Sequence, residues 1–280
     1  MIRSSTQLKD LVRNKSKGDS NKAQIIIRSY IMERFLERVS FSEYKNNFVP
    51  KGGLLISSMV GIDHRSTMDI DGTIQNMPLT IESARNMLEK IIAIPLEDNT
   101  FFSIKSMNEI MDEAEYDGIR ISLEAQIDKM KTSLKIDIST GDVITPRKIS
   151  YQYKLIFEER IISVWAYNLE TMLAEKLETV IRRGTTNTRL RDFYDLHILQ
   201  NVAVHPMDED KFKQAFYATV KKRNSFPFLE SHNLILQEVR DSDVMQGLWQ
   251  NYQKKFDYSQ DISWNAVMLS IFSLFSIISE

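Results

Sequence analysis

The spacing of apolar residues predicts that the first part of the chain mixes helices and strands. Apolar side chains recur every three or four residues over 20–40 and again from Thr80 to Pro95, which is the period of a helix. Residues 116–127 alternate strictly between apolar and polar, and 133–138 do the same, as half-buried strands do. Both element types are therefore expected before the middle of the chain.

Local signals refine these elements. Ser20 is expected to cap the first helix, and Glu33 and Glu37 are expected on the wetter side of that helix. Thr80, with Glu82 and Ser83 nearby, is expected to cap the second helix. The isoleucine-rich residues 156–164 predict one more strand.

The segment after the first helix carries a glycine pair, Gly52-Gly53, and a short helix is predicted directly behind Gly53. Residues Thr67–Asp71 are predicted to form a strand, and Gly72 is expected to end it.

After Trp165 the pattern becomes mostly helical. A helix is predicted over Glu170–Arg183, with Gly184 as its C-cap. We therefore expect an α+β domain over residues 1–165 and a helical domain over 166–280.

The two ends of the chain favour a protein outside the membrane. Residues 1–22 are polar and lack the apolar core of a signal peptide. Trp264–Ser279 is the most apolar stretch, but it is shorter than the roughly 20 residues that span a bilayer. We expect a terminal helix docked on a core or on a partner, and we disfavour a membrane anchor.

Composition is that of an ordinary globular protein, with 42% hydrophobic and 26% charged residues. The net charge of −2 gives no overall basic excess, so any contact with nucleic acid requires a local patch. The absence of cysteine excludes disulfides, thiolate zinc sites and cysteine nucleophiles, and it fits a reducing cytoplasm. The histidines show no zinc-binding spacing; they are His64, His197, His205 and His232.

Three aspartates are the candidate metal ligands. Asp69 and Asp71 are two residues apart in a predicted strand, so their carboxylates share a face and repel each other. A divalent cation relieves that repulsion, and hard oxygen ligands suit Mg²⁺ or Mn²⁺. Asp137, on the polar face of another predicted strand, would complete a cluster for one or two metal ions. Taken alone, Asp137 is better explained as a solvated aspartate near a turn.

The glycine pair lies upstream of these aspartates and is a candidate phosphate-binding loop. Gly52 and Gly53 would let the backbone approach a bulky anion, although such a pair also occurs in ordinary turns. The chain lacks the spacing of a P-loop. Ser57 either donates to phosphate oxygens or fills a helix turn, and Arg65 and Thr67 directly precede the aspartate pair.

A cationic cluster follows in the helical part. Lys176 lies on the apolar stripe of its predicted helix, where an unpaired ammonium is costly. Either Asp192 or Asp195 pairs with it and locks two helices, or Lys176 meets a triphosphate. Arg183 on the same helix face supports the second reading, and Asp192 and Asp195 share a face of their own helix. The densest basic stretch, which is either a solvated loop or a contact for a polyanion such as RNA, consists of Arg182, Arg183, Arg189 and Arg191.

These residues, in this order, resemble the motifs of the AbiEii/AbiGii toxin family of nucleotidyltransferases, a branch of the DNA polymerase β-like fold. The resemblance covers residues 45–200 approximately. It rests on Gly52-Gly53 with Arg65-Ser66-Thr67-Met68-Asp69-Ile70-Asp71, on Asp137, on Leu169-Glu170-Thr171-Met172-Leu173-Ala174-Glu175-Lys176-Leu177, and on Arg189-Leu190-Arg191-Asp192-Phe193-Tyr194-Asp195-Leu196. Leu54-Leu55 replaces the Thr-Ala that commonly follows the glycines, which leaves one hydroxyl fewer near the phosphates.

The resemblance implies an α+β, polymerase β-like nucleotidyltransferase domain with a small mixed sheet. It implies that the glycine loop holds an NTP, that Asp69 and Asp71 bind Mg²⁺, that Lys176 contacts the nucleotide phosphates and that Asp192 is essential. The family supplies the toxin of toxin–antitoxin or abortive-infection phage-defence systems, and some members add nucleotides to the 3′ end of tRNA. A tRNA acceptor and a cognate antitoxin are therefore the expected partners.

The first hypothesis is a Mg²⁺-dependent transfer of NMP from an NTP to an RNA 3′ hydroxyl or to a protein hydroxyl, with Asp137 as third ligand or general base. The alternative is a catalytically inactive protein of the same fold that binds a nucleotide or a partner. A hydrolase or nuclease ranks last, because a glycine loop followed by two aspartates suits triphosphate handling better than cleavage.

Overall fold

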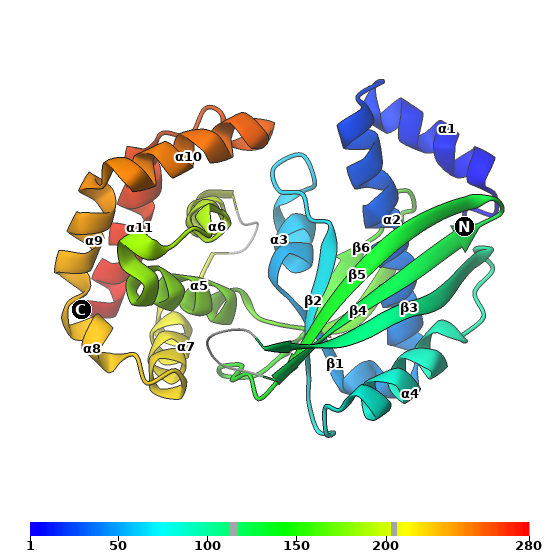
Figure 1. Cartoon of the computed structure of the whole chain (residues 1–280), viewed down its shortest axis with the longest axis horizontal. Helices are drawn as coiled ribbons and strands as arrows, with labels where there is room; N and C mark the ends of the chain where they lie inside the picture. Colours follow the sequence, from blue (N-terminus) through cyan, green and yellow to red (C-terminus); the bar gives the residue numbers. More distant parts are fainter. Residues whose placement is uncertain (112–116, 203–205, 280) are drawn as a thin grey trace. The chain divides into compact units, whose positions relative to one another are not determined.

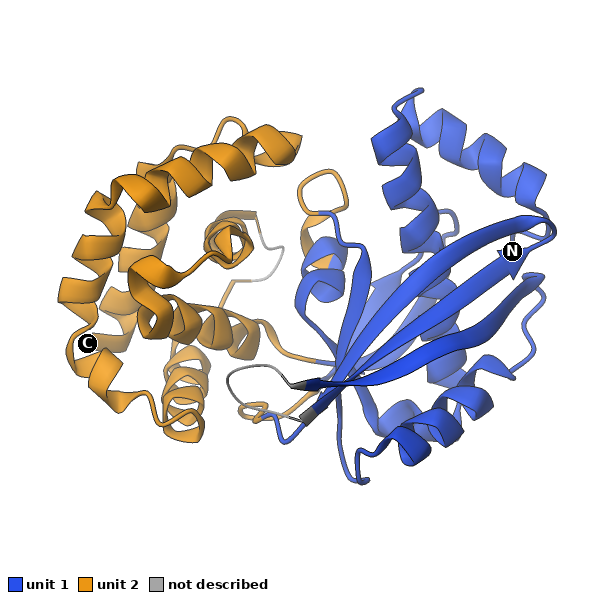
Figure 2. Ribbon diagram, viewed as in Figure 1, with its two compact units in different colours: residues 1–58, 66–142, 149–166 blue, residues 59–65, 143–148, 167–280 orange. Residues whose placement is uncertain are grey.

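The computed structural model describes residues 1–111, 117–202 and 206–279, and the chain divides into two compact units (Figures 1 and 2). Unit 1 consists of Met1–Ser58, Ser66–Asp142 and Ile149–Ala166. Unit 2 consists of Met59–Arg65, Val143–Lys148 and Tyr167–Glu280. His205 lies outside the described residues.

Unit 1 is built on a five-stranded sheet with the strand order β1-β2-β5-β4-β3. β2 and β5 run parallel and the other neighbours run antiparallel, so the sheet is mixed, and the predicted α+β class is confirmed. A separate two-stranded sheet pairs β6 with β7. The strands are β1 (Phe48–Lys51), β2 (Asp69–Ile74), β3 (Thr100–Met111), β4 (Asp117–Ile127), β5 (Met130–Thr140), β6 (Ile149–Lys154) and β7 (Ile161–Ala166).

The helices of unit 1 include one that the sequence reasoning did not identify, α1 (Ser5–Ser16). The predicted first helix is α2 (Ser20–Phe41), which packs on β5 and β7 and on α4 (Ile81–Ile92). Thr80 is the N-cap of α4 and forms a capping box with Ser83, as the sequence indicated. The predicted short helix behind the glycines is α3 (Gly52–Val60).

Two expectations for α2 were wrong. Asp19 caps the helix instead of Ser20, since its carboxylate accepts hydrogen bonds from the amides of Asn21 and Lys22. Glu33 and Glu37 are 3% and 1% exposed, because residues of the β6–β7 connection cover them: the Ile156 amide donates to Glu33 and Arg160 pairs with Glu37.

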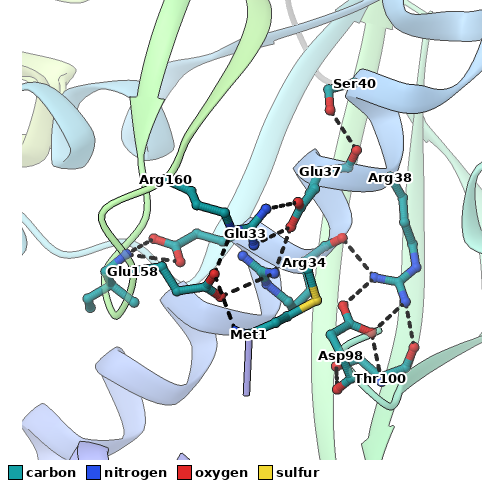
Figure 3. Close-up of polar contacts among 11 residues, drawn as sticks. Met1, Glu33, Arg34, Glu37, Arg38, Ser40, Asp98, Thr100, Glu158 and Arg160 are labelled. Atoms are coloured by element: carbon teal, nitrogen blue, oxygen red, sulfur yellow. Dashed lines mark hydrogen bonds and ion pairs between the residues drawn. The ribbon is translucent and has the colours of Figure 1, made fainter. Parts of the chain in front are cut away.

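Figure 3 shows how these buried charges are balanced. Arg34 Nη1 lies 2.6 Å from Glu37 Oε2, and Arg160 from the β6–β7 connection also reaches Glu37 at 2.6 Å. Arg38 donates two hydrogen bonds to the carboxylate of Asp98, of 2.9 and 3.0 Å. The apolar period of α2 therefore predicted a helix correctly, while its buried charged residues pair both with each other and with residues from other segments of unit 1.

Strand boundaries also differ from the expectation. β2 begins at Asp69 and continues through Gly72 to Ile74, so Gly72 lies within the strand and does not end it. A Cβ on Gly72 would lie 3.0 Å from the ring of Phe48 on the paired strand β1. Gly72 thus makes room for an aromatic ring within the sheet. The strand predicted over 156–164 begins at Ile161, and the predicted strands 116–127 and 133–138 are β4 and β5, with residue 116 outside the described part.

Unit 2 is helical in the residues after Tyr167. The helices are α5 (Leu169–Arg183), α6 (Leu190–Val202), α7 (Glu209–Lys222), α8 (Phe226–Glu230), α9 (His232–Asp241), α10 (Asp243–Lys255) and α11 (Trp264–Ser279).

The predicted terminal helix is α11, which packs on α6, α7 and α9 and buries most of its apolar side chains in the core of unit 2, while Leu269 is exposed. Gly184 follows α5 with a φ of 50°, as expected for its C-cap. Within the described ranges, no helix combines the length and apolar character required to cross a membrane.

The burial of Glu33 generates a prediction about pH. Both of its carboxylate oxygens accept from the Ile156 amide, at 2.9 and 3.1 Å, yet burial raises the pKa of Glu33 to about 8. The folded state then binds more protons than the unfolded state between pH 4.5 and 8, so this group costs stability as pH rises through that window.

Glu33→Gln keeps an acceptor for the amide and removes the titration. We expect equal stability of variant and wild type near pH 5, and a variant more stable by about 1 kcal/mol or more near pH 9, in denaturant titrations. The exposed Glu89→Gln serves as the control. A stability difference that stays constant across this pH range would contradict the assignment.

Candidate active site

The three predicted metal-binding aspartates lie on one face of the sheet of unit 1. Asp69 and Asp71 are two residues apart on β2, so their side chains point the same way. The parallel register places Asp137 of β5 directly beside Asp71. Neighbouring strands lie about 4.8 Å apart, so two carboxylates in register repel each other strongly.

A charged row crosses four strands at this level of the sheet. Its members, in spatial order, are Lys51, Asp71, Asp137 and Arg120. Two carboxylates in the centre are thus flanked by one cation on each side. The sequence reasoning missed both cations, because their place beside the aspartates follows from strand register.

Each end of the charged row is fixed by hydrogen bonds. Lys51 Nζ lies 2.5 Å from Asp142 Oδ2 and 2.9 Å from Ser139 Oγ. Burial alone would raise the pKa of Asp142, but the charge of Lys51 outweighs it and holds that pKa below its usual value. Arg120 holds Asp137 in bidentate fashion, with bonds of 2.9 and 2.8 Å to its two oxygens.

Lys135 is a third cation at the carboxylates. Its Nζ lies 3.9 Å from Asp69 Oδ2 and 3.5 Å from Asp137 Oδ2. Among the described residues, no group of three or more acidic or histidine side chains is arranged to hold a metal ion. The hard oxygens of Asp69 and Asp71 fit Mg²⁺ in kind, whereas both oxygens of Asp137 are taken by Arg120.

The glycine turn packs directly on this carboxylate face. Gly52 has a φ of 64°, which side chains rarely tolerate, and a Cβ there would lie 2.7 Å from Asp71 Oδ2. Gly52 also opens α3, whose first-turn amides have no partner inside the helix and suit an anion. Of the other candidates, Ser57 on α3 is buried and Thr67 donates weakly to the Asp69 carbonyl at 3.3 Å.

The predicted basic and acidic residues of unit 2 form a buried charge quartet, Arg65, Lys176, Asp192 and Asp195. Lys176 Nζ lies 2.5 Å from Asp192 and 2.9 Å from Asp195, so the structure shows the ion pairing that was one of the two readings of this lysine, and it involves both aspartates. Arg65 also pairs with Asp195, donating hydrogen bonds of 2.6 and 3.2 Å to its two carboxylate oxygens.

The quartet has two positive and two negative side chains, and all four are mostly shielded from solvent. Asp195 is fully buried and Arg65 is 1% exposed, while Lys176 and Asp192 retain 15% and 16% exposure. Burial alone would lower the pKa of Lys176, but the two aspartates outweigh it and raise that pKa. Burial would raise the pKa of Asp195, but Arg65 and Lys176 outweigh it and lower that pKa. Both residues therefore stay charged at neutral pH.

The remaining arginines have different surroundings. Arg182 lies 3.2 Å from buried Glu178, and the Nε of Arg183 has no hydrogen-bond partner within the part of the chain that the structure describes. Arg189 is exposed. Arg191 lies over the ring of Phe256, at 5.7 Å from its centroid.

A carboxylate pair in an α+β unit, with a helix opening at a glycine that touches it, is an arrangement suited to a nucleoside triphosphate and its metal ion. The chain belongs to the family "Nucleotidyl transferase AbiEii toxin, Type IV TA system", whose profile matches residues 34–268. It is thus a nucleotidyltransferase of a toxin–antitoxin family, as its motifs predicted.

Two solved structures from Helicobacter pylori resemble the chain. One, of a candidate nucleotidyltransferase, has 15% identity and a TM-score of 0.48, and covers 91% of this chain and 95% of its own. The other, JHP933, has 14% identity and a TM-score of 0.49, and covers 91% and 92%. No curated protein matches the chain significantly.

The contact between Gly52 and Asp71 is testable by adding one methyl group. Gly52→Ala is expected to displace the carboxylate and abolish nucleotide transfer, at a cost of roughly 1–2 kcal/mol in stability. The measurements are nucleotide incorporation and thermal unfolding.

The matched control is Gly18→Ala, which has the same backbone strain at a φ of 87° but open space around the added Cβ. Equal activity of the two variants would show that the close approach of Gly52 is not needed.

The two aspartates of the charge quartet are expected to differ in role, with Asp195 needed for stability and Asp192 needed for nucleotide transfer. Asp195→Asn removes the buried carboxylate charge that pairs with Arg65 and Lys176, and is expected to destabilise the protein by about 3 kcal/mol. Asp192→Asn leaves Lys176 paired with Asp195, so the fold should persist while transfer is lost.

Thermal unfolding and incorporation assays on both variants test this division. A stable Asp195→Asn variant, or an active Asp192→Asn variant, would contradict it.

Proposed function

We propose that this protein is a Mg²⁺-dependent toxin that transfers NMP from an NTP to the 3′ end of an RNA, with tRNA as the preferred class of acceptor. The observation that carries the proposal is the close approach of Gly52 to Asp71. It brings the amides at the start of α3, which suit a triphosphate, next to carboxylates that suit its metal ion.

In the proposed reaction, Asp69 and Asp71 hold Mg²⁺, which supplies charge neutralisation on the phosphates when bound. The glycine turn at Gly52 and Gly53 binds the triphosphate through backbone amides, with Ser57 and Thr67 as hydroxyl candidates. An acceptor hydroxyl oxygen attacks the α-phosphorus, and pyrophosphate leaves as the α–β bond breaks. Asp137 assists as a further oxygen ligand or accepts the hydroxyl proton.

Lys176 and Arg183 of unit 2 are the proposed contacts for the phosphates, and Asp192 orients Lys176. Because the ion pairs hold Lys176 in its charged form, its ammonium group is available to donate to a phosphate oxygen. Arg65 supports this group through Asp195.

The proposed RNA contact rests on cations placed over aromatic rings in unit 2. Phe256 lies under Arg191 at 5.7 Å and under Lys255 at 5.5 Å, and it stacks on Tyr258 at 5.4 Å. Aromatic rings beside cations bind single-stranded RNA by stacking and by charge. Arg189 extends this basic surface. The family also implies an antitoxin partner.

A second candidate function is a catalytically inactive protein that binds nucleotides. The bidentate bond between Arg120 and Asp137 favours it, because that bond occupies the oxygens that a third ligand or a base would need. This candidate predicts Mg²⁺-dependent NTP binding without any product.

The deciding experiment incubates the protein with each α-labelled NTP, Mg²⁺ and total RNA, and then separates the RNA by size. Wild type should label RNA of tRNA length, and Asp69→Asn should lower labelling by at least about a hundredfold with unchanged thermal stability. Asp10→Asn, an exposed residue of α1, is the control. Undiminished labelling by Asp69→Asn would refute the active-site assignment, and NTP binding without labelling would favour the inactive alternative.

A further inference from the structure

Two cations lie where the carboxylates of unit 1 would otherwise face only one another. Lys135 Nζ is within 3.9 Å of both Asp69 and Asp137, and it projects from β5 in register with Asp69. Arg120 engages both oxygens of Asp137 from β4. Together they neutralise two of the three negative charges that Asp69, Asp71 and Asp137 contribute.

These contacts differ from the other ion pairs of unit 1. Arg38 and Asp98 are almost wholly buried, so they are fixed parts of the core. Lys135 and Arg120 are 39% and 46% exposed, and the carboxylates that they hold are 31% and 20% exposed. Pairs this accessible are weak in water and can exchange partners at little cost.

A divalent cation entering this face competes with Lys135 for the carboxylate of Asp69, and with both Lys135 and Arg120 for the carboxylate of Asp137 if Asp137 serves as the further oxygen ligand. A triphosphate has the opposite effect, since its negative oxygens offer the two side chains new partners. Long lysine and arginine side chains can swing from a carboxylate to a phosphate without any change in the sheet.

We propose that Lys135 and Arg120 act as exchangeable counter-ions of the carboxylate site. Without a nucleotide they pair with the carboxylates and weaken the binding of a lone metal ion, and when metal and nucleotide bind together they pair with the triphosphate. They are positioning and binding residues that couple the two ligands. The inference rests on the proposed function, since it assumes that Asp69 and Asp71 receive the metal with Asp137 as a further oxygen ligand, and that a triphosphate binds beside them.

The proposal has an unusual consequence for Lys135→Met. Removing the competing charge should tighten binding of a lone divalent cation, while removing a phosphate partner should weaken binding of a triphosphate. A purely structural role would weaken both. Opposite changes in the two affinities are therefore the expected signature.

The first measurement titrates the nucleotide-free protein with Mn²⁺ and follows free Mn²⁺ by electron paramagnetic resonance. Lys135→Met and Arg120→Met should each bind Mn²⁺ about three- to tenfold more tightly than wild type, in keeping with partly exposed pairs. The second measurement is calorimetric titration with inorganic tripolyphosphate and Mg²⁺, which avoids any base preference. There both variants should bind about three- to tenfold more weakly.

Lys131→Met is the matched control. Lys131 lies on the same strand as Lys135, loses the same charge on substitution and pairs with Glu124 at 3.1 Å. It should leave both affinities unchanged, and Lys135→Gln should reproduce the effect of Lys135→Met.

The outcomes separate this inference from the proposed function. If Mn²⁺ binds wild type and Asp69→Asn abolishes that binding, but Lys135→Met behaves like Lys131→Met, then the counter-ion inference is overturned and the metal site stands. If Mn²⁺ binds none of these proteins, or binds Asp69→Asn as well as wild type, both are overturned. Weakening of both ligands in a folded Lys135→Met variant also overturns the inference.

Discussion

The repulsion between Asp71 and Asp137, held side by side on parallel strands, is the constraint to which the surrounding structure responds. Like charges at strand spacing are unfavourable unless cations lie close to them. The sheet supplies these cations in register, with Lys51 beyond Asp71 and Arg120 beyond Asp137. The arrangement leaves a carboxylate face that is stable without a ligand and still has exposed oxygens to offer one.

Unit 2 solves a similar problem in a different way. In its charge quartet Asp195 has no exposed surface, so the loss of either Arg65 or Lys176 would leave a buried charge less well compensated. Only Lys176 and Asp192 keep contact with solvent. The same residue types therefore serve as fixed supports on one side of the quartet and as accessible groups on the other.

Sequence reasoning succeeded where local chemistry decides the outcome. The alternation in β4 and β5, the cap at Thr80 and the need of Lys176 for an anion are all visible in short windows. It failed where distant segments meet. Glu33 and Glu37 fall between apolar positions, but residues of the β6–β7 connection bury them, and no local pattern reports that.

The sequence did not predict the cations beside the aspartates, for a related reason. Arg120 and Lys135 lie on the polar faces of predicted strands, which ordinarily indicates solvent exposure. Only the pairing of β2 with β5 and of β5 with β4 shows that these faces carry the aspartates as well. Register is a tertiary property, and a shift of one residue would have placed the same side chains on the opposite face.

The parallel pairing of β2 with β5 also bears on how the protein is made. Thr73 and Ser139, which meet across these strands, are 66 residues apart in the chain, whereas β3, β4 and β5 pair with their immediate neighbours. Closing so long a loop is slow, and it cannot begin until the later strand exists. On the ribosome, a nascent chain would therefore carry Asp69 and Asp71 for some time before β5 emerges to complete the carboxylate face. The five-stranded sheet, and with it the row of carboxylates, is thus complete only after most of unit 1 has been synthesised.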